Sequence, residues 1–339
     1  MTFLPGLADV VHDEVVRRLR PTGAVRPVTG RDDALTLDLP GWDRRVLGLR
    51  TAVAVWAVVH LDVPRPRSLI SGEHLRHIVR AVQASIAVEV GRTFRFEAAG
   101  SDAGTFARLG SELAAATGLT YRPLDGELAI RVRRPPATSA ADPGWDVLVR
   151  IGARPLSARR WRQVDYPGAL NATIAAAMVV LAGSRPADRV ANLMCGSGTL
   201  LVERLLAGPA ATAVGVDLAE PALAAARTNL AAAGVDAELV LGDATDPRTL
   251  GSRTFDLLLA DPPWGDLHGS GADADRVHTG RLAAAAALAA PGARCMVVTG
   301  QVTVMNRAVR AAADRWDVDE PRRVFAKGHH PRLYLLRRR

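Results

Sequence analysis

The feature that most constrains the fold of this chain is a regular alternation of strand-like and helix-like stretches that begins after Ser184. The strand-like stretches are short β-branched or leucine-rich runs that end in turn residues: RVANLM, TAVGVDL, AELVLGDA, FDLLLADPP and ARCMVVTG. Helix patterns lie between them, at residues 199–207, 221–233 and 281–290. Such an alternation predicts a parallel sheet with crossover helices, an α/β fold. The tail RRVFAKGHHPRLYLLRRR predicts an antiparallel hairpin, with a tight turn at residues 328–331, that closes the sheet.

Residues before Ser184 lack this alternation and predict a smaller α+β unit. We expect a strand-rich run at 45–63, helices at 71–88 and 105–117, and strands at 93–97, 128–132 and 145–151. Residues 134–144, RPPATSAADPG, have the composition of an exposed loop. Residues 171–182 predict a helical bridge between the two parts. At ~150 residues per domain, a chain of 339 residues has room for both.

The composition restricts the class of protein. Hydrophobic residues make up 48% and charged residues 23% of the chain, as in a folded globular protein and unlike a disordered one. Two cysteines argue against a disulfide framework and favour a reducing compartment, the cytoplasm. The apolar runs fall well short of the ~20 residues that cross a bilayer, and the start lacks the basic segment of a signal peptide. We therefore expect a cytoplasmic protein without a membrane partner.

The charge of the chain points to a phosphate-bearing partner. The formal charge is +8, and all but one of the 43 basic residues are arginines. Between Arg122 and Arg162 the chain has nine arginines and four acids. Arginine suits phosphate because its planar guanidinium donates hydrogen bonds in pairs and stays charged. On charge alone, a solvated arginine-rich surface remains the alternative.

The strongest local signal is NLMCGSGTLLVE, residues 192–203, in which a strand ends in a glycine turn that opens a helix. Gly196 and Gly198 have no β-carbon, so the backbone can turn sharply and let a ligand approach the helix N-terminus. Asp217 ends the next strand, about 20 residues further on, the distance expected of an acid that binds a ribose diol. Asp243 ends a third strand, where a carboxylate can meet an adenine amino group. The three strand ends predict one nucleoside pocket.

A fourth strand ends in ADPPWG, residues 260–265, and this sequence indicates what else enters the pocket. The prolines that follow Asp261 fix the backbone and direct carbonyls outward, because proline supplies no N–H group. Trp264 offers a flat face for stacking. An acidic acceptor, a rigid carbonyl at Pro262 and a stacking ring together suit a planar, amine-bearing nucleobase. The polar segment 266–280 that follows predicts a loop, either one that orders over substrate or a plain connection.

These motifs resemble those of class I S-adenosylmethionine-dependent methyltransferases. NLMCGSGT is similar to motif I, VGVDL to motif II, LGDA to motif III and DPPWG to motif IV, in the form used by enzymes that methylate exocyclic amino groups. Together with the basic α+β region upstream, they resemble the THUMP-containing RNA methyltransferases, in particular those that make N2-methylguanosine at position 6 of tRNA. The resemblance implies a Rossmann-like domain with a seven-stranded mixed sheet and a terminal antiparallel hairpin. It also implies four parts: a ferredoxin-like segment at 1–50, a THUMP-like RNA-binding domain at 51–153, a linker with a helix at 154–184, and the methyltransferase domain at 185–339.

The resemblance implies S-adenosylmethionine as the cofactor and assigns roles to individual residues. The predicted cofactor-binding residues are Thr173, Asn192, Met194, Cys195, Gly196, Ser197, Gly198, Thr199, Asp217, Leu218, Asp243, Ala244 and Asp261. The predicted catalytic residues are Asp261, Pro262 and Trp264. The family usually begins motif I with Asp-Pro, whereas this chain has Asn192 and Leu193. Asparagine can still hydrogen-bond the methionine ammonium but brings no charge.

A tRNA is the implied partner, with an rRNA as a further possibility, and the chain is expected to be a monomer. The predicted RNA contacts are Arg159, Arg160, Arg162, Lys327 and Arg332. His74 and His77 lie three residues apart on a predicted helix, but no cysteine or acid completes a metal-binding set, so no metal is expected.

Three alternatives stay open. The same chemistry could serve position 10 of tRNA or a ribosomal guanine. The DPPW sequence also allows methylation of adenine N6 in DNA. Finally, Asn192 is compatible with an RNA-binding protein that has lost activity, although the intact Asp217, Asp243 and Asp261 argue against that interpretation.

Overall fold

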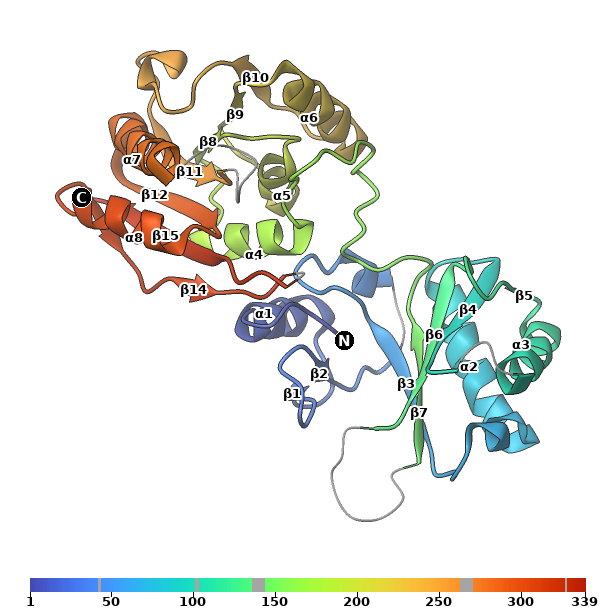
Figure 1. The fold of residues 1–339 in the computed structure, drawn as a ribbon. Coiled ribbons are helices and arrows are strands. Elements are labelled where there is room, and N and C mark those ends of the chain that lie inside the picture. Colours follow the sequence, from blue (N-terminus) through green and yellow to red (C-terminus); the bar gives the residue numbers. More distant parts are fainter. Residues whose placement is uncertain (42–43, 101–103, 136–143, 263–270, 327) are drawn as a thin grey trace. The chain divides into compact units, whose positions relative to one another are not determined.

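The computed structural model describes residues 1–41, 44–100, 104–135, 144–262, 271–326 and 328–339 (Figure 1). The chain divides into two compact units, one of residues 1–3 and 11–157 and the other of residues 4–10 and 158–339. A mixed five-stranded sheet lies in the first unit and a larger mixed sheet in the second.

The first unit is a small α+β structure, as predicted. The elements up to residue 157, in chain order, are α1 (Ala8–Leu19), β1 (Arg26–Pro27), β2 (Leu35–Thr36), η1 (Arg44–Gly48), β3 (Trp56–Leu61), η2 (Pro66–Ile70), α2 (Gly72–Val88), β4 (Thr93–Glu97), α3 (Gly104–Thr117), β5 (Thr120–Tyr121), β6 (Leu128–Arg133) and β7 (Trp145–Arg150). The sheet order is β3-β7-β6-β4-β5. Strand β4 runs parallel to β5 and β6, and the other pairs are antiparallel. Phe96 packs its ring against Phe106 of α3 at a centroid distance of 5.3 Å, which joins sheet to helix.

The prediction for residues 45–63 was wrong in its first half. Only β3 is a regular strand there, and the segment before it forms η1. Val46 and Leu49 are each 1% exposed, so their apolar character reflects burial in a short helical turn and not strand pairing. The linker predicted at 154–184 divides at Ser157, because residues from Ala158 onward group with the second unit. The four-part division stays a prediction.

The second unit contains the predicted α/β sheet. Its strands are β8 (Arg189–Leu193), β9 (Thr212–Asp217), β10 (Glu238–Leu241), β11 (Phe255–Ala260), β12 (Ala289–Thr299), β13 (Trp316–Val318), β14 (Arg322–Arg323) and β15 (Arg332–Arg338). Seven of them follow the order β10-β9-β8-β11-β12-β15-β13, and β14 pairs with β15 off this path. Strands β8 to β12 are parallel to one another, whereas β12, β13 and β14 each pair with β15 in antiparallel fashion. The described sheet thus has one strand more than the seven predicted.

Continuous apolar runs explain why these strands are parallel and central. Leu257, Leu258 and Leu259 of β11 are completely buried, as expected for a strand covered on both faces. The helices of this unit are α4 (Ala172–Ala182), α5 (Thr199–Ala207), α6 (Glu220–Ala233), η3 (Pro247–Leu250), α7 (Gly271–Leu288) and α8 (Val302–Ala311). Helices α4, α5 and α6 contact one another in one layer, and α7 and α8 pack together in another (Figure 1). This arrangement is the parallel sheet with crossover helices that the alternation predicted, and it has the Rossmann-like form that the resemblance implied.

Helix α7 begins ten residues earlier than the helix predicted at 281–290, so the described part of the predicted loop 266–280 is helical from Gly271 onward. Residues 266–270 lie outside the described residues. Glycines in GADADRVHTG lower the local helix propensity, but His278 and Arg281 are each 1% exposed. Tertiary packing therefore extends the helix beyond what propensity predicts.

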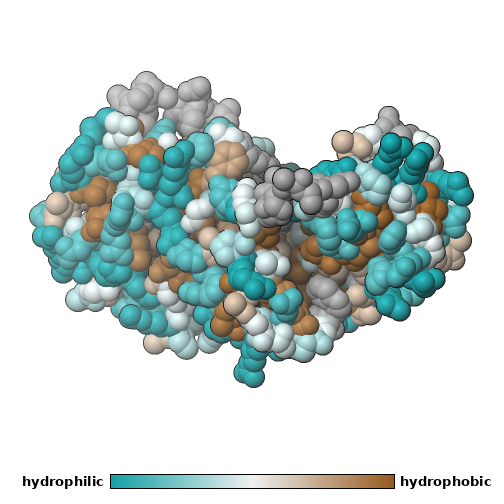
Figure 2. Space-filling model, turned by 90° about the horizontal axis from the view of Figure 1, so that it is seen from below, coloured by the Kyte–Doolittle hydropathy of each residue, from teal (hydrophilic) through white to brown (hydrophobic). Residues whose placement is uncertain are grey.

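The exposed surface matches a chain whose apolar residues are mostly in the cores. Figure 2 shows polar side chains over most of the face that it presents, with apolar residues in small separate groups. In the described part of the chain, none of the helices is both long enough and apolar enough to span a bilayer.

Candidate functional site

The parallel strands bring the four motif-bearing loops to one edge of the sheet. Leu193, the last residue of β8, lies opposite Val216 of β9 on one side and Ala260 of β11 on the other. Leu241 of β10 lies opposite Asp217. Because these strands end at nearly the same level, the segments that follow them lie at the same carboxyl edge, where ligands of α/β sheets bind.

The loop after β8 has the backbone conformation that its glycines predicted. Gly196 and Gly198 have positive φ angles of 52° and 80°. A β-carbon on Gly196 would meet no atom within 4 Å, so this side of the loop is open, whereas one on Gly198 would lie 3.2 Å from the Cβ of Ala226 in α6. Met194 adopts a φ of 61° without being a glycine, a strained conformation of the kind that clusters at ligand sites. Gly196 thus leaves an open surface on the loop, and Gly198 allows close packing against α6.

Asp217 is fixed directly against this loop. Its Oδ2 accepts a hydrogen bond of 2.8 Å from the Gly196 N–H, and its Oδ1 accepts one of 3.0 Å from the Ala219 N–H. Leu218, beside it, is 69% exposed and offers an apolar surface next to the carboxylate. Asp217 therefore stands where the spacing predicted a ribose-binding acid.

Asp243 lies at the end of β10, in an exposed turn. Its Oδ1 accepts from both the N–H and the Oγ1 hydroxyl of Thr245, at 2.8 and 2.7 Å, while Ala244 between them is buried. The turn holds this carboxylate in a fixed orientation.

Three buried polar atoms of residues in the predicted cofactor set have no hydrogen-bond partner among the described residues. They are the Thr173 Oγ1 at the start of α4, the Asn192 Oδ1 in β8 and the Ser197 Oγ in the glycine loop. The Asn192 amide is oriented by its Nδ2, which donates to the Leu259 carbonyl at 3.2 Å. Buried polar atoms normally have partners, and leaving one unsatisfied costs about 1–3 kcal/mol. The three atoms are therefore candidate contacts for a polar ligand, and all three residues belong to the predicted cofactor-binding set.

Of the predicted catalytic residues, two lie in the described part of the chain. Asp261 follows β11 directly and is partly exposed, and Pro262 after it is buried. Trp264 lies outside the described residues. Cys195 and Thr199, also in the predicted cofactor set, are buried. Burial raises the pKa of the Cys195 thiol well above its ordinary value, so this group is neutral at physiological pH.

Two of the predicted RNA contacts have other roles, which corrects that prediction. Arg159 forms an ion pair with Glu203 of α5 at 2.8 Å, with side chains 9% and 0% exposed. Arg162 donates through Nη2 to the Leu170 carbonyl at 2.7 Å and to the Thr199 hydroxyl at 2.9 Å, and its guanidinium lies 5.5 Å from the ring of Trp161. Both side chains therefore fasten the segment before α4 to α5. A single sequence shows the charge of an arginine but not its partner.

The other predicted RNA contacts remain candidates. Arg160 is exposed, and Arg332, the first residue of β15, lies opposite Thr299 at the carboxyl end of β12. Lys327 lies outside the described residues.

Sequence reasoning missed a buried polar cluster between α7 and the start of α8. It consists of His278 and Arg281 on α7 and Gln301 just before α8. Nothing in the local pattern of α7 distinguishes these residues from solvent-exposed ones, because the partner residues come from another element.

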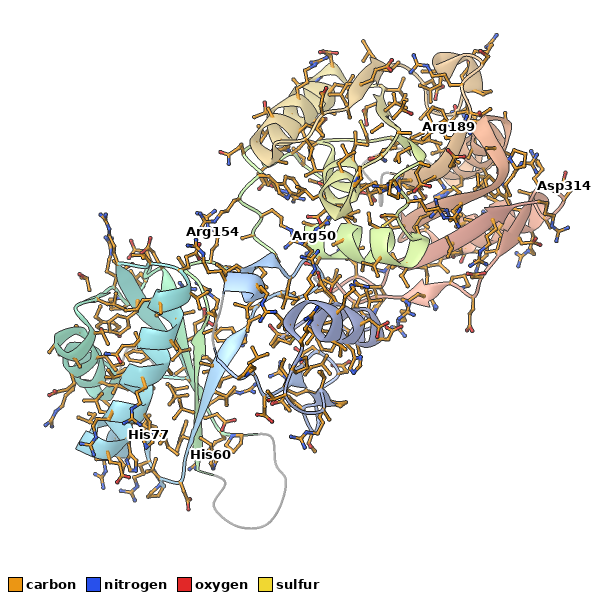
Figure 3. The ribbon with its side chains drawn as sticks, turned by 180° about the vertical axis from the view of Figure 1, so that it is seen from behind. Arg50, His60, His77, Arg154, Arg189 and Asp314 are labelled. Atoms are coloured by element: carbon orange, nitrogen blue, oxygen red, sulfur yellow. The ribbon has the colours of Figure 1, made fainter. Side chains whose placement is uncertain are left out.

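No group of three histidine, cysteine or acidic side chains that could hold a metal occurs within the ranges that the structure describes. The histidines labelled in Figure 3, His60 and His77, come from different elements, β3 and α2.

Comparison with known proteins identifies the family. Residues 159–332 match the family described as "RMKL-like, methyltransferase domain". Over 349 aligned residues, covering 99% of this chain and 98% of the relative, the sequence is 30% identical to the tRNA (guanine(6)-N2)-methyltransferase of Thermus thermophilus. The chain belongs to this methyltransferase family.

Two further relatives support the assignment. The crystal structure of TrmN from Thermus thermophilus aligns over 100% of this methyltransferase and 98% of that chain, with a TM-score of 0.75 and 25% identity. The tRNA (guanine(10)-N2)-dimethyltransferase of Methanothermobacter thermautotrophicus is 34% identical over 105 residues, 31% of this chain and 30% of that protein. The predicted Rossmann-like methyltransferase fold is confirmed.

The cofactor of this methyltransferase family is S-adenosylmethionine, and the site fits it. Asp217 and the exposed Leu218 suit the adenosine half of the molecule. The unpartnered oxygens of Thr173, Asn192 and Ser197 suit its polar amino-acid half, which bears an ammonium and a carboxylate. When bound, the cofactor supplies a methyl group made electrophilic by a positively charged sulfur.

Replacing Asp217 with asparagine is expected to weaken S-adenosylmethionine binding by about 10- to 100-fold, since a hydrogen bond to a charged group contributes about 1.5–3 kcal/mol. Titration calorimetry with the cofactor measures the change. Asp236→Asn, which alters an exposed acid in the turn before β10, is the matched control. An unchanged Kd in Asp217→Asn would remove Asp217 from the cofactor site.

Proposed function

We propose that this methyltransferase transfers a methyl group from S-adenosylmethionine to the exocyclic N2 of a guanosine in tRNA, most specifically at position 6. The observation that carries the proposal is the similarity to the position-6 enzyme of Thermus thermophilus, which extends over 99% of this chain. The position-10 relative matches only 31% of this chain. A match of that extent supports a shared chemistry but not a shared choice of nucleotide. Both relatives act on guanine N2, which favours guanine over adenine as the target of the Asp261 motif.

The residues after β11 are suited to an amine that is a poor nucleophile. The lone pair of a guanine N2 is delocalised into the ring, so the nitrogen must become pyramidal before it attacks. The Asp261 carboxylate and the Pro262 carbonyl accept the two hydrogens of the amine and favour that geometry. After transfer the nitrogen carries one proton too many, and the Asp261 carboxylate is the acceptor in place to take it.

Positioning supplies most of the rate in this proposal. Holding two reacting groups in line gives effective concentrations of about 10⁵ M or more. In the pairing of β11 with β8, Ala260 lies opposite Leu193, the last residue before the glycine loop. Asp261 is the next residue after Ala260. Amine and methyl donor are therefore presented from neighbouring strands. Stacking of the extruded base on Trp264 stays a prediction.

We further propose that the THUMP-like N-terminal region binds the RNA and that Arg160, Lys327 and Arg332 contact phosphates. Contacts of this kind give an affinity that falls steeply with salt and depends little on base identity. We propose a monomer that acts in the cytoplasm, an environment suited to its two cysteines, which are both free and buried.

Nucleoside mass spectrometry of tRNA tests the proposed function. Bulk tRNA from a strain that lacks the gene is expected to have lost N2-methylguanosine at position 6, and added enzyme with S-adenosylmethionine should restore it. Loss of N2-methylguanosine at position 10 or in rRNA would mean that the enzyme carries out the same reaction on a different guanosine. New N6-methyladenine in DNA, or cofactor binding without any transfer, would contradict the proposal.

A further inference from the structure

The hairpin formed by β14 and β15 has a buried face and an exposed face (Figure 1). Arg323 lies opposite Arg332 in this hairpin. The next residues on the two strands, Val324 and Pro331, are joined by a backbone hydrogen bond of 3.0 Å and are both buried. Because successive side chains of a strand point to opposite faces, the two arginines belong to the other face, where Arg323 is exposed and Arg332 is partly exposed.

An aromatic pair continues the exposed face toward the tip of the hairpin. Ala326 and His329 exchange two backbone hydrogen bonds of 2.9 Å, so Phe325 lies opposite His330. The centroids of these two rings are 5.0 Å apart, with 54° between the ring planes. Phe325 is 39% exposed, and His330 is exposed as well. We call the side chains of Arg323, Phe325, His330 and Arg332 the hairpin face.

The two arginines of the hairpin face have no acidic partner. Like charges directly opposite one another destabilise an antiparallel strand pair. Within the described ranges neither Arg323 nor Arg332 forms an ion pair, whereas Arg322, on the other face of β14, is paired with Asp9 at 2.6 Å. Two guanidinium groups held side by side suit a phosphate, which accepts paired hydrogen bonds from arginine. The arrangement therefore indicates an anionic ligand.

The strand pairing places the hairpin face close to the site of methyl transfer. Three residues lie directly opposite one another across β11, β12 and β15: Ala260, Val297 and Tyr334. Neighbouring strands are about 4.8 Å apart, so β15 lies about 10 Å to the side of β11. At about 3.3 Å per residue, Arg332 lies nearly level with Asp261, and His330 lies about 10 Å further out. The hairpin face thus rises beyond the carboxyl edge of the sheet, next to the loop that begins with Asp261.

Helix α8 covers this side of β15 only in part. Tyr334, on the same face as Arg332, is completely buried, and its hydroxyl donates to the Asn306 Oδ1 of α8 at 2.9 Å. Arg332 is partly exposed and His330 is exposed, so the cover that the described residues provide ends between Tyr334 and His330. A further backbone contact fixes the hairpin, since the Phe325 N–H donates to the Pro5 carbonyl at 3.1 Å. The hairpin face is therefore both accessible and ordered.

We propose that the hairpin face binds a nucleotide next to the target guanosine, with Arg323 and Arg332 on a phosphate and the rings of Phe325 and His330 against a base. This inference rests on the proposed function, which gives Arg332 a phosphate contact but assigns nothing to the other three side chains. Extrusion of the target base uncovers the faces of its neighbours in the stack. Aromatic and histidine rings stack on bases that have become unstacked in this way.

The first test is the affinity of Phe325→Ala for an unmodified tRNA transcript with guanosine at position 6. Fluorescence anisotropy measures the Kd in the presence of S-adenosylhomocysteine, so that no methyl group is transferred. We expect a Kd about 5- to 100-fold above that of the wild type, the effect of losing one stacked base. Phe325→Trp, which keeps a flat ring, should bind as the wild type does. Leu206→Ala is the matched control, because Leu206 of α5 is also 39% exposed.

The second test separates the phosphate contacts from the stacked base by the salt dependence of the same Kd. Arg323→Gln and Arg332→Gln should each lower the slope of log Kd against log salt concentration by about 0.7–0.9, the value for one neutralised phosphate. Phe325→Ala should keep the wild-type slope. Arg310→Gln, which removes an exposed arginine from the last turn of α8, is the control for these variants and should also keep that slope.

An Phe325→Ala enzyme that binds tRNA as tightly as the wild type would overturn the inference, as would arginine variants with an unchanged slope. A lower urea midpoint with unchanged RNA affinity would show that the rings only stabilise the hairpin. If Phe325→Ala does not fold, Phe325→Leu replaces it, since leucine keeps an apolar partner for His330 without a flat ring. A wild-type enzyme that binds tRNA through these side chains but methylates no guanosine would contradict the proposed function and not this inference.

Discussion

Replacing Asp261 with asparagine is expected to lower kcat for methyl transfer by about 10²- to 10³-fold, as does removal of one preorganised hydrogen-bonding group at a transition state. The amide has nearly the same shape as the carboxylate, so packing after β11 is preserved. It carries no charge, accepts the amine hydrogens more weakly and cannot take up the released proton. Single-turnover kinetics with labelled cofactor measure the loss without interference from product release.

Asp256→Asn is a matched control for this substitution, because it makes the same change on the same strand. Asp256 is the second residue of β11, at the opposite end of the strand from the site, and pairs with Arg189 at 2.9 Å. Arg189, labelled in Figure 3, is the first residue of β8. We expect the control to keep the wild-type kcat and both variants to keep the wild-type affinity for S-adenosylmethionine. Equal kcat values for Asp261→Asn and wild type would refute the role given to Asp261.

Asp188→Ala is expected to lower the free energy of unfolding by about 3–5 kcal/mol, the cost of leaving buried charges without their partner. Asp188 is 2% exposed and lies between two buried arginines, with its Oδ2 3.1 Å from the Arg204 Nη2 and its Oδ1 bonded to the Arg294 Nη2. Arg294 in turn donates to the carbonyls of Ala182 and Gly183 at the end of α4. The triad therefore joins α4, α5 and β12, and its loss leaves two cations buried.

Urea unfolding of the cofactor-free protein measures this loss. The control is Glu220→Gln, which removes an acid from an ion pair with Arg227 whose side chains are both more than half exposed. Exposed pairs contribute about 0–1 kcal/mol, so the control should unfold close to the wild-type midpoint. A midpoint for Asp188→Ala as close to wild type as that of the control would mean that the arginines find other partners.

The sequence was sufficient to predict the strands that are buried on both faces, because each is a continuous apolar run that ends in turn residues. The strands β8 to β11, the glycine loop and Asp217 were predicted close to the residues where the structure has them, because apolar runs and turn residues encode them locally. Strand β12 was predicted from residue 293 but begins at Ala289, within the helix predicted at 281–290. Helix α5 was predicted to the residue, at 199–207. The helical bridge predicted at 171–182 is α4, which Asn171 caps with its Oδ1 accepting from the Thr173 N–H at 2.8 Å.

The features that escaped prediction depend on contacts between elements. Whether an arginine is a surface cation or an internal cross-link depends on a partner many residues away, as for Arg159 and Glu203. The same reason hides Arg281, whose neighbours come from β12 and α8. The early start of α7 likewise follows from packing against α8, which local propensity does not contain.

The hydrogen bonds that Arg162 makes to Leu170 and Thr199 limit where the catalytic half can be cut from the rest of the chain. A fragment cut to start at β8 would retain every methyltransferase motif yet lose Arg159, Arg162 and α4 with Thr173. Glu203 would then lose its buried ion pair with Arg159, and the unit would lose the helix that bears the unpartnered Thr173 hydroxyl. A fragment that keeps these side chains therefore has to start near Ala158, and it would still lack residues 4–10, which group with the same unit.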